Sequence, residues 1–104
     1  MIEIHMITKK LGQVKEILEL LIINELIIGA TVVDSTSSYL CNKNKIKSVP
    51  SKMIIGRTRA GLFSTIEKLL QAKYGDDIPM IYGMPIVGMG KKNTEKLKKI
   101  IEKP

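Results

Sequence analysis

The sequence has little cysteine, little histidine and few aromatic residues. Its 104 residues include one cysteine, one histidine, one phenylalanine, three tyrosines and no tryptophan. A single cysteine excludes an internal disulfide framework, so the fold needs no oxidising compartment. One cysteine and one histidine also exclude a zinc-finger-type site within one chain. No run of about 18 apolar residues occurs, so no segment is predicted to span a membrane.

No basic segment is followed by an apolar stretch and a small-residue cleavage site, so we expect no export signal. Together with the lone cysteine, this predicts a cytoplasmic protein. The length suits one domain. Hydrophobic residues at 44% and charged residues at 26% are ordinary globular values. We therefore expect residues 1–104 to form a single domain.

Positive charge is concentrated near the end of the chain. The formal net charge is +7, and residues 91–104 hold six lysines against two glutamates. Such a cluster can mark a surface for nucleic acid or an anionic membrane, or simply the solvated face of a helix. No RNA-binding motif or aromatic platform accompanies the lysines. We therefore favour the solvated helix and expect neither nucleic acid nor membrane as a partner.

Hydrophobic periodicity divides the chain into strands and helices. Residues 2–7 alternate as a strand, with Ile2, Ile4 and Met6 on one face and His5 on the other. Helical spacing follows from 11 to 26 and from 62 to 74, with Thr8 and Thr58 as expected N-caps. Two β-prone segments, 30–40 and 46–57, flank a turn at 41–45 and form a hairpin. Residues 78–87 form a fourth strand, and a final helix is capped at 93 or 94.

This order, β-α-β-β-α-β plus a C-terminal helix, predicts the α+β fold called ferredoxin-like, or split βαβ. Each hairpin arm of about 11 residues would be roughly 35 Å long. A domain of this size has a radius of gyration of only about 13 Å, so the hairpin overhangs it. Exposed strand edges invite pairing, and a closed homo-oligomer would cover them. Alternatively, Pro50 breaks one arm and the tip is a loop.

Several segments resemble the CutA family of divalent-cation tolerance proteins over nearly the whole chain. Residues 20–29 resemble a helix end that reads Leu-Val-Glu-x-x-Leu-Ala-Ala-Cys in that family. Residues 37–41 with 45–46 resemble its Ser-x-Tyr-x-Trp hairpin and the Gly-Lys-Ile that follows. Residues 57–58 occupy the position of the family's Lys-Thr. Residues 77–79 with 84–86 resemble its Tyr-Glu-Val-Pro strand, which ends in Leu-Pro. The order and spacing of these segments make the resemblance specific.

The departures identify a divergent sequence. Cys41 stands at the family's hairpin tryptophan, and residues 30–31 lack the cysteine that begins its second strand. Residues 74–77 replace a His-Pro-Tyr-Glu motif and keep only the final acid. The resemblance implies a PII-like and CutA-like trimer joined through the long hairpins, with no catalytic reaction. The expected interface residues are Tyr39, Ile46, Pro79 and Tyr82.

Three residues are candidate ligands for a divalent cation or copper. Cys41 is the one soft ligand, and three copies in a trimer would suit Cu(I), unless it is an isolated thiol. His5 is a candidate ligand or pH switch, or else a structural side chain. Asp77, beside Asp76, is a candidate ligand for a hard cation, or part of a turn that enters the strand.

Arg57 and Arg59 are candidates for binding an anion near the start of the second central helix. The simpler alternative pairs them with Glu67 or Asp34 at the surface. No nucleophile-elbow motif or dinucleotide fingerprint occurs, so we expect no enzyme. The resemblance thus implies a cytoplasmic, trimeric, metal-responsive protein without catalysis. The alternative is a PII-like sensor that binds a small anion or nucleotide in clefts between subunits.

Overall fold

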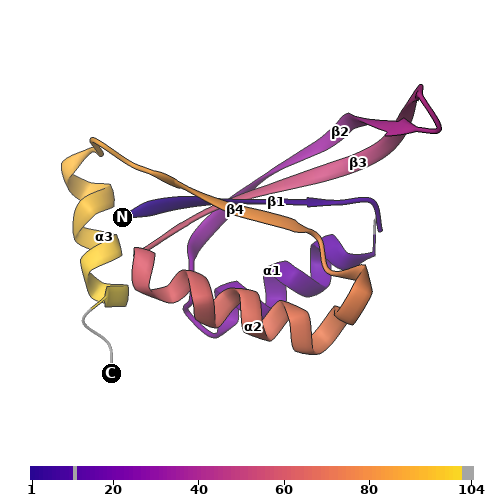
Figure 1. Ribbon diagram of the computed structural model, residues 1–104. Coiled ribbons are helices and arrows are strands. Elements are labelled where there is room, and N and C mark those ends of the chain that lie inside the picture. Colours follow the sequence, from indigo (N-terminus) through magenta and orange to yellow (C-terminus); the bar gives the residue numbers. More distant parts are fainter. Residues whose placement is uncertain (11, 102–104) are drawn as a thin grey trace.

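The computed structural model describes residues 1–10 and 12–101. Within these residues, four strands, three helices and two short 3-10 turns follow one another (Figure 1). Their bounds are β1 Ile2–Thr8, α1 Gln13–Ile23, β2 Ile28–Asn42, β3 Lys45–Thr58, a turn at Ala60–Leu62, α2 Phe63–Tyr74, a turn at Gly75–Asp77, β4 Met80–Pro85 and α3 Lys91–Ile101. None of these helices is long and apolar enough to cross a membrane.

The strands form one antiparallel sheet in the order β2-β3-β1-β4. This is the ferredoxin-like α+β topology that the sequence predicts. In the middle of the sheet Ile4 lies between Gly56 on β3 and Gly83 on β4. A Cβ at Gly56 would lie 2.9 Å from the Cδ1 atom of Ile27. Glycine therefore lets the chain before β2 pack closely against the sheet.

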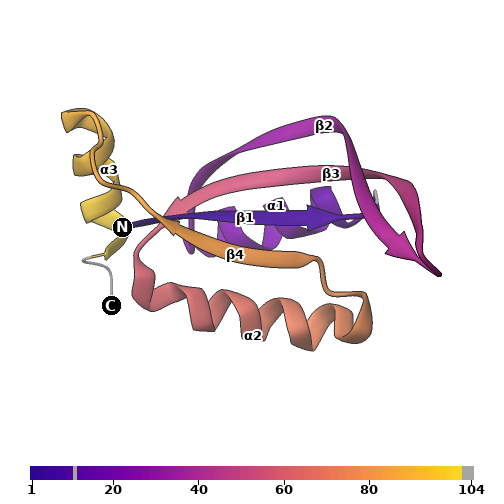
Figure 2. The ribbon, with the colours of Figure 1, turned by 45° about the horizontal axis from the view of Figure 1, so that its top comes forward.

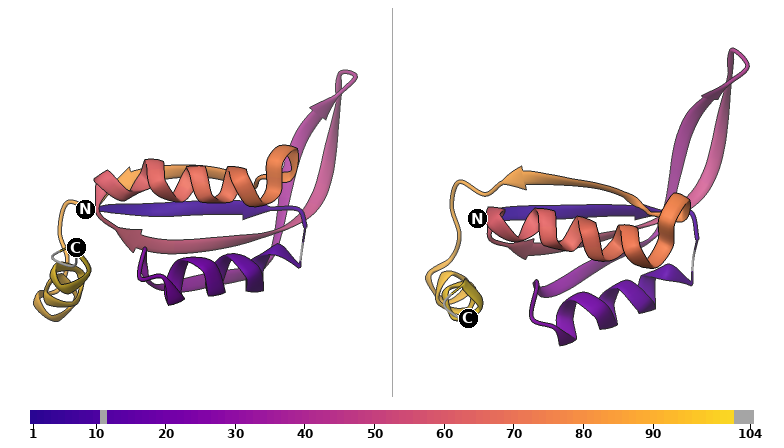
Figure 3. Two further views of the ribbon diagram at one scale, coloured as in Figure 1. Left: turned by 90° about the horizontal axis from the view of Figure 1, so that it is seen from below. Right: turned by 60° about the horizontal axis from the view of Figure 1, so that its bottom comes forward.

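Helices α1 and α2 lie side by side on one face of the sheet (Figures 1 and 3). The expected alternation of β1 is confirmed, because Ile4 and Met6 are fully buried beneath these helices. The helices contribute apolar stripes with helical spacing. Leu11, expected in the first stripe, lies outside the described residues. The buried apolar core comprises Ile4, Met6, Val14, Ile17, Leu21, Ile27, Ile54, Ile66 and Leu70.

The hairpin formed by β2 and β3 extends well beyond the rest of the sheet (Figure 2). Its arms are 15 and 14 residues long, longer than the sequence pattern predicts. Strand β1 ends at Thr8, opposite Lys52, so residues 45–51 of β3 pair with β2 alone. Pro50 lies in this outer part, where its missing N–H breaks no second ladder. Strand β3 therefore does not break at Pro50. We call the outer part of the hairpin, residues 36–51, the hairpin arm.

Several predicted boundaries are wrong by a few residues for local reasons. The hairpin turn is only Lys43 and Asn44, both with positive φ, so Cys41 is in a strand and not in the turn. Thr8 caps no helix, because α1 begins at Gln13 with Gly12 at its N-cap position, and the Thr8 hydroxyl accepts a hydrogen bond from the Lys10 amide before the helix begins. The hydroxyl of Thr58 instead donates to the Leu26 carbonyl.

The ends of two helices also differ from the prediction. Helix α1 ends at Ile23, and not near residue 26, because Glu25 has a φ of 57°. Helix α3 begins at Lys91, so the expected caps Asn93 and Thr94 lie inside the helix. The Thr94 amide and hydroxyl both donate to the Gly90 carbonyl. Helix α3 lies at the end of the sheet opposite the hairpin arm (Figure 1).

Candidate functional site

The face of the sheet turned away from α1 and α2 carries mixed polar and apolar side chains. Alternation along β1 turns Glu3, His5 and Ile7 to this side. The strand register places Tyr82 and Ile55 on either side of His5. We call this surface the open face; it comprises Glu3, His5, Ile7, Met53, Ile55, Arg57, Met80, Tyr82 and Met84.

His5 lies at the centre of a polar cluster on the open face. Its Nε2 atom is 2.5 Å from Glu3 Oε1, and its Nδ1 atom is 3.2 Å from the Tyr82 hydroxyl. The two rings lie 5.1 Å apart, and the His5 side chain is only 13% exposed. Both ring nitrogens are engaged, so a metal ion bound at His5 would displace Glu3 or Tyr82. Alternation along the strand places Glu3 on the same face as His5, but it does not predict that the two side chains are in contact.

The three predicted metal ligands do not meet within one chain. Cys41 is exposed in the hairpin, opposite Ile46. His5 is on the open face, and Asp77 lies in the 3-10 turn before β4. In the described part of the chain, no three His, Cys, Asp or Glu side chains gather as a metal site. The convergence of Cys41 copies concerns an assembly and stays a prediction.

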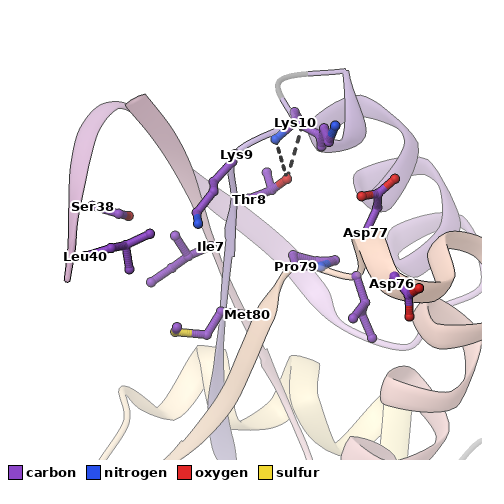
Figure 4. A pocket seen from close by; sticks show the side chains of 11 residues that line it. Ile7, Thr8, Lys9, Lys10, Ser38, Leu40, Asp76, Asp77, Pro79 and Met80 are labelled. Carbon is purple, nitrogen blue, oxygen red and sulfur yellow. Dashed lines mark hydrogen bonds between the residues drawn. The ribbon is translucent and has the colours of Figure 1, made fainter. Parts of the chain in front are cut away.

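A cavity of about 520 Å³ lies at the base of the hairpin arm, and we call it the hairpin pocket (Figure 4). Ser38 and Leu40 stand at one side and Asp76 and Asp77 at the other, with the Lys9 side chain between them. The two carboxylates point in different directions, so they do not form a shared cation site. The pocket is lined by Ile7, Thr8, Lys9, Lys10, Ser38, Leu40, Asp76, Asp77, Ile78, Pro79 and Met80.

A buried polar chain fixes the position of Asp77. The Thr8 hydroxyl donates to Gln13 Oε1 at 2.5 Å, and Gln13 Nε2 donates to the Asp77 carbonyl at 2.8 Å. Thr8 and Gln13 are both almost fully buried. The contacts join the end of β1, the start of α1 and the turn before β4. These hydrogen bonds were not predicted from the sequence, because a single buried glutamine does not change the hydrophobic periodicity.

The predicted interface residues differ in exposure. Ile46 is 83% exposed and Tyr39 69% exposed, both on the hairpin arm. Tyr82 is 38% exposed on the open face. Pro79 is buried within the chain, so little of its surface is accessible to a partner. Three of the four residues therefore present apolar surface to solvent in a single protomer.

The two predicted anion-binding arginines are in different environments. Arg57 is half-buried on the open face and lines a second cavity, of about 310 Å³, with Ile28, Met89 and Asn93. Arg59 follows β3, is exposed, and is not among the described residues that line this cavity. Asp34, a predicted partner of the arginines, instead contacts Lys52 at 3.6 Å.

Tyr74 shows the one clear electrostatic perturbation among the described residues. Burial, together with the hydrogen bond that its hydroxyl donates to Glu16 Oε1 at 2.9 Å, raises the pKa of Tyr74 to about 12. Partial burial and a nearby carboxylate both disfavour tyrosinate. This contact joins α2 to α1 on the helix side of the sheet, so it contributes to the fold and not to either cavity.

No family model matches the sequence, and no curated protein matches it by sequence. Solved structures match it by fold. The periplasmic divalent cation tolerance protein CutA from Archaeoglobus fulgidus aligns with a TM-score of 0.84 and 19% identity, over 98% of this chain and 100% of its own. CutA1 from Oryza sativa aligns with a TM-score of 0.82 and 22% identity, over 95% and 91%.

The divalent ion tolerance protein CutA1 from Ehrlichia chaffeensis aligns equally well, with a TM-score of 0.83 and 19% identity over 95% and 92%. The chain therefore has the fold of the CutA proteins, including the long hairpin. The identities are those of a divergent sequence, as the departures at residues 30, 41 and 74–77 predict. The resemblance inferred from the sequence is confirmed at the level of the fold.

Proposed function

We propose that this chain is a homotrimeric protein without catalytic activity that takes part in the response to divalent metal cations. The observation that carries the proposal is the fold, shared over 95% or more of this chain with two proteins named for divalent ion or cation tolerance and with a third named CutA1. One fold hosts many functions. The proposal therefore also draws on the surfaces that a single protomer leaves uncovered.

Two of those surfaces support self-association. The hairpin arm exposes Tyr39, Leu40 and Ile46, and β4 exposes Met80 and Met84. Strands β2 and β4 are the two edges of the sheet, so each protomer presents two different edges for pairing. Contacts between different patches close into a ring when the rotation permits. A ring of three copies would cover both edges and the apolar side chains beside them.

In this proposal the cation is divalent or copper, and it is bound between protomers. Within the described residues a single chain offers Cys41, His5 and Asp77 only at separate places. Symmetry copies of such residues can complete a site that one chain lacks. Because Cys41 is an exposed free thiol, we also propose that the protein works in the cytoplasm, as one domain over residues 1–104.

The assembly is tested by light scattering on a sizing column with reductant present. We expect three times the protomer mass of 11.6 kDa. Ile46→Asp, on the exposed arm, should give monomers, because it buries a charge at the contact. Ser37→Asp, an equally charged change at an exposed arm position, is the matched control and should remain trimeric. A monomeric wild type would refute the assembly.

The metal part is tested separately by isothermal titration with Zn(II) and Cu(II) on the wild type, Cys41→Ser and His5→Gln. Binding that weakens in one variant would assign that ligand. A trimer that binds neither ion would refute the metal site while leaving the assembly intact.

A further inference from the structure

The smaller cavity lies where the end of the sheet meets α3, away from the hairpin pocket. Its lining comes from four parts of the chain: Ile28 at the start of β2, Arg57 near the end of β3, Met89 in the connection after β4, and Asn93 in the first turn of α3. Ile28 and Arg57 are direct neighbours in the β2–β3 register. This part of the lining therefore belongs to two paired strands, which hold the arginine in position.

The guanidinium of Arg57 has no partner of opposite charge among the described residues. Its side chain makes no ion pair or hydrogen bond with the residues at 1–10 and 12–101. Glu3 lies opposite it on β1, but the Glu3 carboxylate contacts His5 at 2.5 Å. A guanidinium that is half-buried costs desolvation free energy unless an anion pairs with it. Arg57 therefore presents five N–H donors beside a hollow of about 310 Å³.

The other groups around this cavity suit an anion with an apolar body. The Asn93 amide can donate to an oxyanion, and no acidic side chain is among the described residues of the lining. Lys91 and Lys92 begin α3 beside Asn93, and the helix dipole adds a modest positive field there. Ile28 and Met89 supply apolar walls. A metal cation would be repelled by Arg57.

We propose that this cavity binds a small organic oxyanion, a phosphate ester or carboxylate with an apolar or aromatic body. Arg57 pairs with the oxyanion through two parallel N–H donors, a geometry that favours planar carboxylate and phosphate groups. Asn93 donates a further hydrogen bond, and Ile28 and Met89 contact the apolar body. The volume is about ten times that of one water molecule in the liquid, which leaves room for more than inorganic phosphate alone. This ligand class differs from the cation of the proposed function.

The first experiment titrates the full chain, labelled with ¹⁵N, with phenyl phosphate at constant ionic strength. We expect the Arg57 Nε–H signal and the Asn93 side-chain amide to shift in a saturable way. Inorganic phosphate should bind more weakly because it leaves the apolar walls unfilled, and benzoate tests the carboxylate. Phenol is the neutral control and should shift neither signal. No saturable shift at Arg57 with either phenyl phosphate or benzoate would overturn the proposal.

Two arginine variants separate the site from general attraction to a basic protein. Arg57→Gln should weaken phenyl phosphate binding roughly tenfold or more, because it removes charge-assisted hydrogen bonds. Arg59→Gln removes the same charge two residues away, from an exposed side chain outside the lining. It should change the affinity less than about twofold. Equal losses in the two variants would show non-specific electrostatic binding and refute the site.

A third variant keeps the test valid if Arg57→Gln fails to fold. Asn93→Asp places a negative charge at an exposed position of the lining and should also weaken binding roughly tenfold. Gln71→Glu makes the same kind of change on exposed α2 and should leave the affinity unchanged. Circular dichroism checks the fold of each variant. Because no metal is added, failure here leaves the proposed metal response untouched, and the reverse also holds.

Discussion

The two faces of the sheet differ in what covers them. On β3, Ile54 is fully buried under the helices, whereas the adjacent Ile55 is half-buried on the open face. Helices α1 and α2 of the same chain close the first face (Figure 3). Within residues 1–10 and 12–101, the second face has no such layer and combines methionines and isoleucines with Glu3, His5, Arg57 and Tyr82.

The difference separates what holds the protomer together from what is left for partners. Burial of apolar area is the main stabilising contribution to folding, and here it comes from the helix-covered face. Residues of the open face keep polar groups at defined positions by pairing them with each other, as Glu3, His5 and Tyr82 do. A half-buried mixture of this kind resembles an interaction surface more than a solvated one.

The largest expected effect compares Ile54→Ala with Ile55→Ala. Ile54→Ala removes packed methyl groups from the core and should lower the free energy of unfolding by about 2–5 kcal/mol. This loss should be the same at every protein concentration. Ile55→Ala should have a smaller effect on the protomer, but one that depends on concentration if the open face contacts other copies. Urea unfolding at several protein concentrations measures both.

The same pair of variants can also contradict the distinction between the two faces. If Ile55→Ala costs as much as Ile54→Ala and shows no dependence on concentration, the open face stabilises the protomer just as the covered face does. The two faces would then have the same role, and the support that the open face gives to the proposed assembly would be lost.

An intermediate effect is expected at the buried polar chain beside the covered face. Gln13→Ala removes the side-chain donor to the Asp77 carbonyl and leaves the Thr8 hydroxyl with only its contacts to the Lys10 backbone, which should cost about 1–3 kcal/mol. Gln71→Ala is the matched control, because Gln71 is exposed and donates to the Gly75 carbonyl at 3.3 Å. It should stay within about 0.5 kcal/mol of the wild type. Equal denaturation midpoints for the two variants would show that the hydrogen bonds of Gln13 contribute no stability.

Much of the covered face could be predicted from the sequence. Alternation along β1 and helical spacing in α1 and α2 follow from burial on one side, so Ile4, Ile17 and Ile66 fall where periodicity places them. The strand order then follows from the few topologies that right-handed crossovers allow. Boundaries were less accurate, because caps and turns depend on single residues such as Lys43 and Glu25 with positive φ.

The candidate sites were harder to predict because they depend on contacts between distant segments. Arg57 and Arg59 are close in sequence, but only Arg57 meets Asn93 of α3 across the small cavity. Similarly, Tyr82 reaches His5 from a strand 77 residues away. Periodicity assigns a side chain to a face, but it does not say which other element will lie beside it.

The smallest expected effect tests how the helices that cover the sheet are joined. Tyr74→Phe removes the hydroxyl that donates to Glu16, and it should lower the free energy of unfolding by roughly 0.5–1 kcal/mol near neutral pH. The raised pKa of Tyr74, about 12 against an ordinary value of 10.0, fixes the sign of the pH dependence. Folding favours the protonated form, so the difference from wild type persists below about pH 10 and disappears as pH rises toward about 12. Chemical denaturation across this range measures it. Tyr39→Phe, on the exposed arm, is the control, and an equal pH-dependent change in that variant would contradict the role of the Tyr74–Glu16 contact.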